Sequence, residues 1–189
     1  LVALFVALGV YYSSAVPIFE VPDEPMHYDY VRRLVEGRGL PPLPDSADDW
    51  ELGAAHQPPL YHAIGALLTR GVAIDLAKPA YMRNPYTARG DPSAEGNKNA
   101  VLHTDAESRP YRGVALAVHI LRWFSVACGA LTVALSYALA LAIAPTRRAI
   151  ATGAAALVAL NPQFIFVSAS ACSDALAAAL ISGVLLLCV

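Results

Sequence analysis

The sequence predicts an all-α polytopic membrane protein with about four transmembrane helices. Of its 189 residues, 57% are hydrophobic and only 15% are charged. The mean hydropathy of +0.49 lies above that of most soluble domains. The apolar residues gather in long runs, and a helix needs about 20 such residues to cross a bilayer. The sequence opens and stops inside such runs, so we expect a fragment whose first and last helices are truncated.

Four apolar runs define the expected transmembrane helices. They cover residues 1–19, 114–144, 149–171 and 175–189. The first run lacks the basic start of a secretory signal, so we interpret it as a membrane helix. In the third run, proline in the pair Asn161-Pro162 removes a backbone donor and should bend the helix there.

The connections between these runs predict the topology. Residues 145–148 form a short loop that carries Arg147 and Arg148, and short loops rich in lysine and arginine stay in the cytoplasm. The long polar segment 20–113 and the short loop 172–174 then lie on the other face. The sequence therefore predicts a multi-pass protein of the cell membrane with a large extracytoplasmic loop.

This loop is expected to carry two juxtamembrane amphipathic helices. The stretch DEPMHYDYVRRLVEGRG predicts one helix, with Asp23 as N-cap and Gly37 at its end. Its apolar and charged residues fall on opposite sides, so it can lie flat at the interface. The second helix should run from Pro58 or Pro59 to residue 74. Residues 78–112 are rich in proline, glycine and asparagine and predict an irregular loop.

Acidic residues stand where the chain leaves the first and third spans. Asp23 and Glu24 follow the first span, and Asp174 returns to the same face after the third. Such carboxylates can act as a general base, bind a divalent cation or hold a cationic substrate. Taken alone, the spacing favours a plainer interpretation, in which Asp23 caps a helix and Glu24 faces the positive end of the helix dipole.

Histidines and one amide form the next group of candidates. His56 and Gln57 open the motif HQPPLYH, where two prolines hold polar residues either in a cavity or on a surface loop. Neither they nor His27, His62 and His103 have the spacing of zinc ligands, so zinc is not expected.

Arg122 is the unusual residue of the second span. It lies about two turns inside an apolar helix, on the same face as His119. An arginine at that depth either snorkels to the interface or has a function, and a guanidinium near the outer leaflet suits a lipid phosphate. Both interpretations remain open from the residues alone.

Charge and cysteine content exclude two other classes of protein. The net charge is −2 and no basic cluster is present, so nucleic acid is not an expected partner. Cys128 and Cys188 lie in apolar runs and Cys172 stands near a loop, which does not suggest a disulfide framework.

Four segments together carry a family resemblance. PDEPMHYDYVRRLVEGRGLP, HQPPLYHAIGALL, LRWFSVACGALTVALSYALA and LNPQFIFVSASACSDALA, in this order, resemble the N-terminal part of integral-membrane glycosyltransferases of the GT-C class. This class includes protein mannosyltransferases and the lipid A aminoarabinose transferase. The resemblance spans essentially the whole sequence, which corresponds to only the first third or so of such a chain.

The resemblance implies a function and assigns roles. The donor would be a sugar on a polyprenyl phosphate, and the acceptor a lipid, a glycan or a protein at the membrane. Asp23, with Glu24 as its neighbour, would be catalytic. The substrate-binding residues would be His27, His56, Gln57, Arg122 and Asp174. A divalent metal, Mg²⁺ or Mn²⁺, is left open, and His56-Gln57 stands where some members carry a lysine.

The alternative is a non-catalytic polytopic membrane protein, such as a transporter or an envelope assembly factor, whose external loop binds a partner. Transporters tend to place ionisable residues near the middle of the membrane, on broken helices. In this sequence the acids gather at the predicted surface instead, which favours the enzyme.

Overall fold

The computed structural model describes residues 1–43, 53–74 and 79–189. Within these ranges the chain is helical and has no strand, apart from an isolated bridge between Arg83 and Val101. The all-α prediction is confirmed to this extent. The rest of the predicted external loop, residues 44–52 and 75–78, lies outside the described residues. The described helices are α1 (Val2–Ala15), α2 (Glu24–Val35), α3 (Leu60–Thr69), η2 (Asp105–Glu107), α4 (Gly113–Ile143), α5 (Arg148–Ala159), α6 (Pro162–Ser168) and α7 (Asp174–Leu187).

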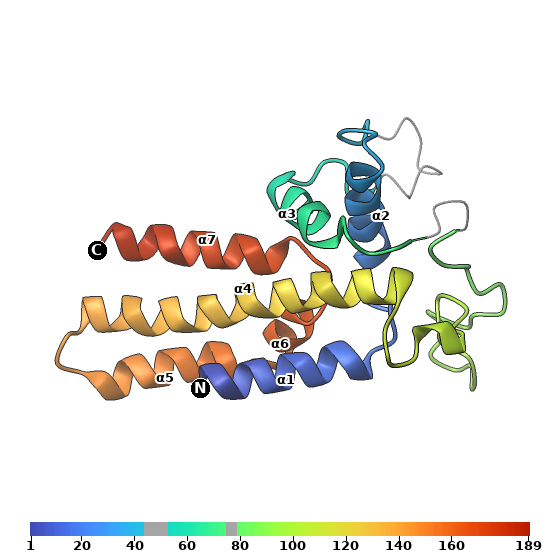
Figure 1. The fold of residues 1–189 in the computed structure, drawn as a ribbon. Coiled ribbons are helices and arrows are strands. Elements are labelled where there is room, and N and C mark those ends of the chain that lie inside the picture. Colours follow the sequence, from blue (N-terminus) through green and yellow to red (C-terminus); the bar gives the residue numbers. More distant parts are fainter. Residues whose placement is uncertain (44–52, 75–78) are drawn as a thin grey trace.

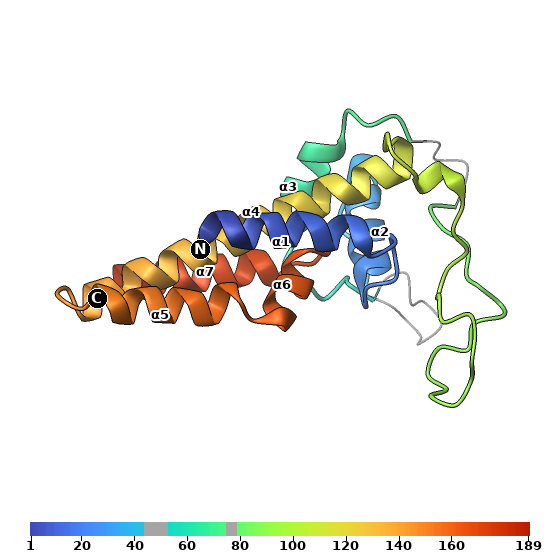
Figure 2. The same cartoon turned by 90° about the horizontal axis from the view of Figure 1, so that it is seen from below.

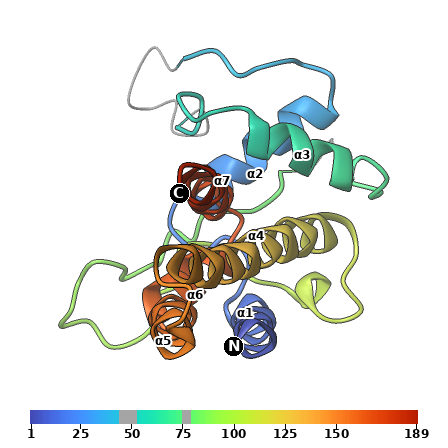
Figure 3. The same ribbon diagram turned by 90° about the vertical axis from the view of Figure 1, so that its left-hand side faces the viewer.

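Four helices run side by side along the long axis of the molecule. Figure 1 and Figure 2 show α1, α4, α5 and α7 roughly parallel, and Figure 3 shows the same helices end on. The short helices α2 and α3 lie beside the first part of α4. The connection between α4 and α5 lies at the opposite end (Figure 1).

Among the described residues, one helix taken singly is long and apolar enough to cross a membrane. It is α4, with 31 residues that are mostly apolar. The pair α5 and α6 also meets the criterion if it is counted as one broken span, bent by 61°. The helices α1 and α7 have 14 residues each, fewer than the about 20 that a full crossing takes. One crossing, or two with the bent pair, is therefore what the helix lengths support.

The bend predicted at Asn161-Pro162 is confirmed. Pro162 begins α6, where a missing backbone N–H costs no helical hydrogen bond. The Asn161 side-chain oxygen accepts from the backbone N–H groups of Gln163 and Phe164 and so caps the new helix.

The helices pack through small residues and expose large ones. The buried positions of α5 are Ala151, Ala155 and Ala159, and those of α7 are Ala175 and Ala179. Large apolar side chains face outward instead, among them Leu4, Leu131, Leu157, Leu180, Ile181, Val184 and Leu187. This distribution is the reverse of that in a water-soluble bundle, and small inward residues let membrane helices approach closely.

The short helices are fixed on α4 by a separate apolar cluster. Phe19, Tyr28 and Val31 are buried there against Val118 and Leu121 of α4. Burial of such side chains contributes roughly 1.5–3 kcal/mol each. The start of α2 is therefore held at a defined place beside α4.

Two details of the short helices differ from the sequence prediction. Asp23 occupies the N-cap position of α2, but its side chain makes no capping hydrogen bond. The helix α3 ends at Thr69, five residues before the predicted end. The Thr69 hydroxyl donates to the Gly65 carbonyl within the last turn. The run of residues that favour a helix stops at Gly71, because glycine destabilises helices.

Candidate functional site

The connection from α1 to α2 makes a tight turn that presents Asp23. Phe19 and Asp23 both adopt left-handed backbone conformations, with φ of 67° and 63°. Residues other than glycine seldom do so, although aspartate tolerates it better than most. The Glu24 carboxylate accepts the Phe19 N–H at 2.8 Å and so closes this turn from within. Asp23 itself is exposed.

Glu24 and Arg122 form a buried ion pair. Both side chains are 0% exposed. Arg122 donates from Nε to Glu24 Oε1 at 2.8 Å and from Nη2 to Oε2 at 2.7 Å, the two-point geometry in which a guanidinium binds a carboxylate most strongly. The Ala171 N–H also donates to Oε1 at 2.9 Å, from the loop before α7.

The other donors of Arg122 are also satisfied by the protein. Its two Nη atoms donate to the carbonyls of Ser13, Val16 and Pro17, at 2.7 to 2.9 Å. All five N–H groups of the guanidinium thus have acceptors. The pair fastens together the end of α1, the start of α2, the first third of α4 and the loop that leads into α7.

This geometry gives Glu24 and Arg122 a structural role within the described part of the chain. A catalytic acid must reach substrate, and Glu24 is fully enclosed with both oxygens in use. A phosphate ligand needs donors, and those of Arg122 all go to protein oxygens. We therefore assign the two residues to the framework that holds the site and do not carry the lipid-phosphate role of Arg122 forward.

Asp23 and Asp174 come together at this end of the molecule. Both side chains are exposed, at the starts of α2 and α7. Each carboxylate lies close enough to His27 to raise the pKa of that histidine, against the lowering by burial. The same two carboxylates also act on the Cys172 thiol, whose pKa burial raises to about 12. The structure thus unites two acids that are 151 positions apart in the sequence, from residue 23 to residue 174.

His27 is buried beneath these acids and is paired with a second histidine. Its Nδ1 lies 2.9 Å from His62 Nε2, and the other ring nitrogen of His62 lies 3.3 Å from the Pro58 carbonyl. Burial lowers the pKa of His27. Burial, together with the neighbouring His27, lowers the pKa of His62 to about 3. Both rings are therefore neutral at pH 7.

His56 and Gln57 belong to the segment before α3, and Gln57 contacts the start of α7 near Asp174. The Ser173 hydroxyl donates to Gln57 Oε1 at 3.3 Å, and the Gln57 amide nitrogen is 3.5 Å from His56 Nε2. His56 also acts electrostatically on His27. Of the seven predicted site residues, five thus gather around one end of α7, and Glu24 and Arg122 lie enclosed beneath them.

An apolar groove leads away from Asp174 between α3 and α7. Its volume is about 370 Å³. Gln57, Ser173 and Asp174 line its polar end. The remaining lining is mostly apolar and consists of Pro58, Leu60, Tyr61, Leu176, Ala177, Leu180 and Ile181. A ligand with a polar head and a long apolar tail fits a groove that is polar at one end and apolar along the rest.

A second cavity lies on the other side of Asp23. It has a volume of about 300 Å³ and lies between the start of α2 and the segment 81–101. Arg83, Arg89 and Asn84 contribute polar groups to its lining, with Phe19 and Tyr81 as aromatic walls. Asp23 therefore borders one cavity and Asp174 the other.

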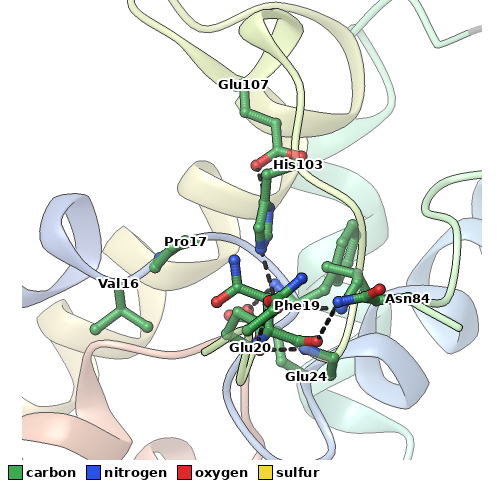
Figure 4. Close-up of polar contacts among 12 residues, drawn as sticks. Val16, Pro17, Phe19, Glu20, Glu24, Asn84, His103 and Glu107 are labelled. Carbon is green, nitrogen blue, oxygen red and sulfur yellow. Dashed lines mark hydrogen bonds and ion pairs between the residues drawn. The ribbon is translucent and has the colours of Figure 1, made fainter. Parts of the chain in front are cut away.

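The segment that walls this second cavity is fastened to the α1–α2 connection. Glu20 accepts the backbone N–H groups of Ala100 and Val101 at 2.8 and 3.1 Å. His103 bridges Glu20 and Glu107 at 2.9 and 2.8 Å (Figure 4). Burial alone would lower the pKa of His103, but its hydrogen bonds to Glu107 and Glu20 outweigh burial and raise it. We call Glu20, His103 and Glu107 the loop latch.

Sequence reasoning missed His62 and Ser173 as members of the site. His62 follows Pro58 by four positions, one helical turn, and this spacing brings its ring to the Pro58 carbonyl. Its partner His27 is 35 positions away, so no local pattern signals the pair. Ser173 occupies the N-cap position of α7 without making a capping hydrogen bond, and its hydroxyl contacts Gln57 instead.

We also tested whether the residues fit the divalent metal left open by the sequence. Among the described residues, no group of three or more histidine, cysteine, aspartate or glutamate side chains is arranged to hold a metal ion.

In the described part of the chain, fold and site define a helical protein with one helix, or two spans with the bent pair, long and apolar enough to cross a membrane. A polar site lies at one end of the helices. Comparisons with protein-family models, with curated proteins and with solved structures found no match.

Proposed function

We propose that this chain is the N-terminal part of a membrane glycosyltransferase that transfers a sugar from a polyprenyl-phosphate donor to an acceptor on the extracytoplasmic face. The resemblance of its motifs to the GT-C class suggests this activity. The observation that carries the proposal is the apolar groove that begins at Asp174 and runs along α7. A lipid-linked sugar needs such a site, with polar groups at the head, here Gln57, Ser173 and Asp174, and an apolar path for the tail.

Placement of the helices in a membrane is part of the proposal. The outward large apolar side chains and inward alanines suit lipid on the outside of the bundle. We propose that α1, α4, the bent pair α5–α6 and α7 all cross. The connection between α4 and α5 lies at the end of the molecule opposite α2 and α3 (Figure 1). Arg147 and Arg148, which belong to this connection and to the start of α5, would then face the cytoplasm.

The proposed chemistry uses Asp23 as the general base. An acceptor hydroxyl attacks the anomeric carbon of the donor sugar while its proton passes to the Asp23 carboxylate. The bond between that carbon and the phosphate oxygen breaks, and the polyprenyl phosphate leaves with the bonding electrons. Asp174, at the head of the groove, would accept hydrogen bonds from sugar hydroxyls. Since donor and acceptor are both held at the interface, orientation supplies much of the rate gain.

The glutamate–arginine pair would support this chemistry indirectly. It ties the loop before α7, through Ala171, to the turn that carries Asp23. The two acids therefore keep a fixed relation to each other, which catalysis requires to well under an ångström.

The test is a transfer assay on the full-length protein in membranes. Labelled polyprenyl-phosphate sugars are supplied as donors, and the label is followed into lipid, glycan and protein fractions. The proposal expects transfer from at least one such donor and none from the same sugar on a nucleotide. Absence of transfer from a panel of these donors, with a protein that inserts normally, would favour the non-catalytic alternative.

A further inference from the structure

His27, His62 and the Pro58 carbonyl form a chain of hydrogen bonds in which each donor and acceptor is fixed. The Pro58 carbonyl can only accept, so His62 Nδ1 must carry the proton that bridges their 3.3 Å separation. A neutral His62 then has no proton on Nε2. That nitrogen must accept across the 2.9 Å contact, so His27 Nδ1 is the donor.

This chain determines the state of the outer nitrogen of His27. A neutral imidazole carries one proton, and Nδ1 uses it toward His62. Nε2, on the opposite edge of the ring from His62, is therefore left as a hydrogen-bond acceptor. Because burial lowers the pKa of His27, the ring stays neutral at pH 7.

Contacts with neighbouring rings hold this chain of hydrogen bonds, the relay Pro58–His62–His27, in place. The Tyr30 ring stacks on His62 with centroids 3.9 Å apart, and the His27 and His62 rings are nearly coplanar in orientation, 13° apart. Tyr61 meets His27 edge on, at 6.2 Å between centroids. His62 is 0% exposed and His27 is 2% exposed. Neither ring is free to turn over without losing these contacts.

The charged groups around His27 come from three elements. Asp23 and Glu24 belong to the start of α2, Asp174 to the start of α7, and His56 to the segment before α3. Glu24 is neutralised by Arg122. What remains next to His27 are two exposed carboxylates, which accept hydrogen bonds and do not donate them.

We infer that the relay Pro58–His62–His27 fixes His27 Nε2 as an acceptor that binds a hydroxyl of the substrate in the Asp23 and Asp174 site. The inference rests on the proposed function for the identity of the substrate. With two carboxylates and an unprotonated nitrogen, this part of the site consists of acceptors. The group that enters here must therefore bring hydrogen-bond donors, as the hydroxyls of a sugar do.

The first arm of the test measures the tautomer and requires no activity. The full-length protein is labelled with ¹⁵N-histidine and studied by NMR at pH 7, with His27→Gln to assign the resonances. We expect His27 with a proton on Nδ1 and none on Nε2, and His62 in the same tautomer. A proton on His27 Nε2 would overturn the inference, whether or not the protein transfers sugar.

The second arm separates binding of substrate from the contact with His62. In His27→Asn the amide can replace Nδ1–H toward His62, whereas in His27→Gln the longer side chain can replace Nε2 and offers its oxygen as an acceptor. We expect His27→Asn to lose roughly tenfold or more in kcat/KM for the acceptor, and His27→Gln to lose less. Equal or better function of His27→Asn would show that His27 serves only the packing with His62.

The pH profile of kcat/KM gives a third readout. Protonation of His27 removes the acceptor, so the wild-type rate should fall on the acid side below pH 6.5, the ordinary value for histidine. Both amide variants should lose this part of the acid limb, because amides do not titrate. An unchanged limb in His27→Gln would contradict the inference. Absence of transfer by the wild type would instead count against the proposed function and leave the tautomer result to decide this inference.

Discussion

At the scale of single residues, the buried pair of Glu24 and Arg122 changes the meaning of a sequence motif. Both residues were expected to contact substrate, and the structure encloses both in the framework. Glu24 and Arg122 are 98 positions apart in the sequence. A local pattern could therefore reveal the unusual arginine but not the carboxylate that neutralises it. An arginine inside an apolar helix has to be paired, and the sequence offered several acids for this role.

We predict that breaking this pair lowers stability. Glu24→Gln leaves the Arg122 charge buried without its counterion, and Arg122→Lys cannot donate to all the acceptors that the guanidinium satisfies. Loss of one partner of a buried pair typically costs about 3–5 kcal/mol. Thermal unfolding of the purified full-length protein should show this loss in both variants.

The exposed Arg70→Lys is the matched control and should unfold as the wild type does. If Arg122→Lys kept the stability of the wild type but bound the lipid donor more weakly, the phosphate role inferred from the sequence would have to be restored.

The conformation of Asp23 is a second feature that the sequence could not specify. A positive φ at a residue other than glycine leaves no reliable signal, and the spacing alone favoured a helix cap. Asp23 occupies the cap position without making the capping bond, so its carboxylate stays available.

At the scale of elements, the long apolar runs were sufficient to predict the main helices. The expected helix 114–144 corresponds to α4, and the proline in the third run produces the bend between α5 and α6. These features depend on composition and on one local steric effect, and both can be seen in the sequence. The contacts that assemble the site join elements far apart in the chain, and periodicity does not encode them.

The loop latch gives a prediction for pH dependence at this scale. The pKa of His103 is raised in the folded state, since its hydrogen bonds to Glu107 and Glu20 outweigh burial. Its stabilising contribution is therefore complete below about pH 6.5, the value in an unfolded chain, and is lost as pH rises through the folded pKa. Tryptic cleavage after Lys98 in the membrane-embedded protein should become faster over that pH range. The increase should exceed the increase in trypsin activity measured on an unstructured peptide at the same pH values.

His103→Gln supplies the control for this measurement, because an amide does not titrate. Its cleavage should be fast at all pH values, so that the ratio of wild-type to variant rate climbs toward one as pH rises. A ratio that does not vary with pH would show that protonation of His103 does not control how firmly the segment 81–101 is attached.

At the scale of the whole molecule, the orientation in the membrane can be tested by labelling. Cys172 and Cys188 are replaced by serine, and Cys128 is buried. Single cysteines are then placed at Ser93, in the segment that walls the second cavity, and at Thr146, beside Arg147. A membrane-impermeant thiol reagent added to intact cells should label the first and not the second. Labelling of Thr146→Cys alone would reverse the proposed topology and remove the site from the extracytoplasmic face.

The central claim is that Asp23 and Asp174 form a catalytic site for transfer of a lipid-linked sugar. The most direct measurement compares initial transfer rates in membranes for wild type, Asp23→Asn, Asp174→Asn and the control Asp105→Asn, at equal levels of inserted protein. Because loss of a general base costs about 10²-fold or more in rate, Asp23→Asn should abolish most transfer. Asp174→Asn should be intermediate, and Asp105→Asn should resemble the wild type. Turnover of Asp23→Asn close to that of the wild type would contradict the claim.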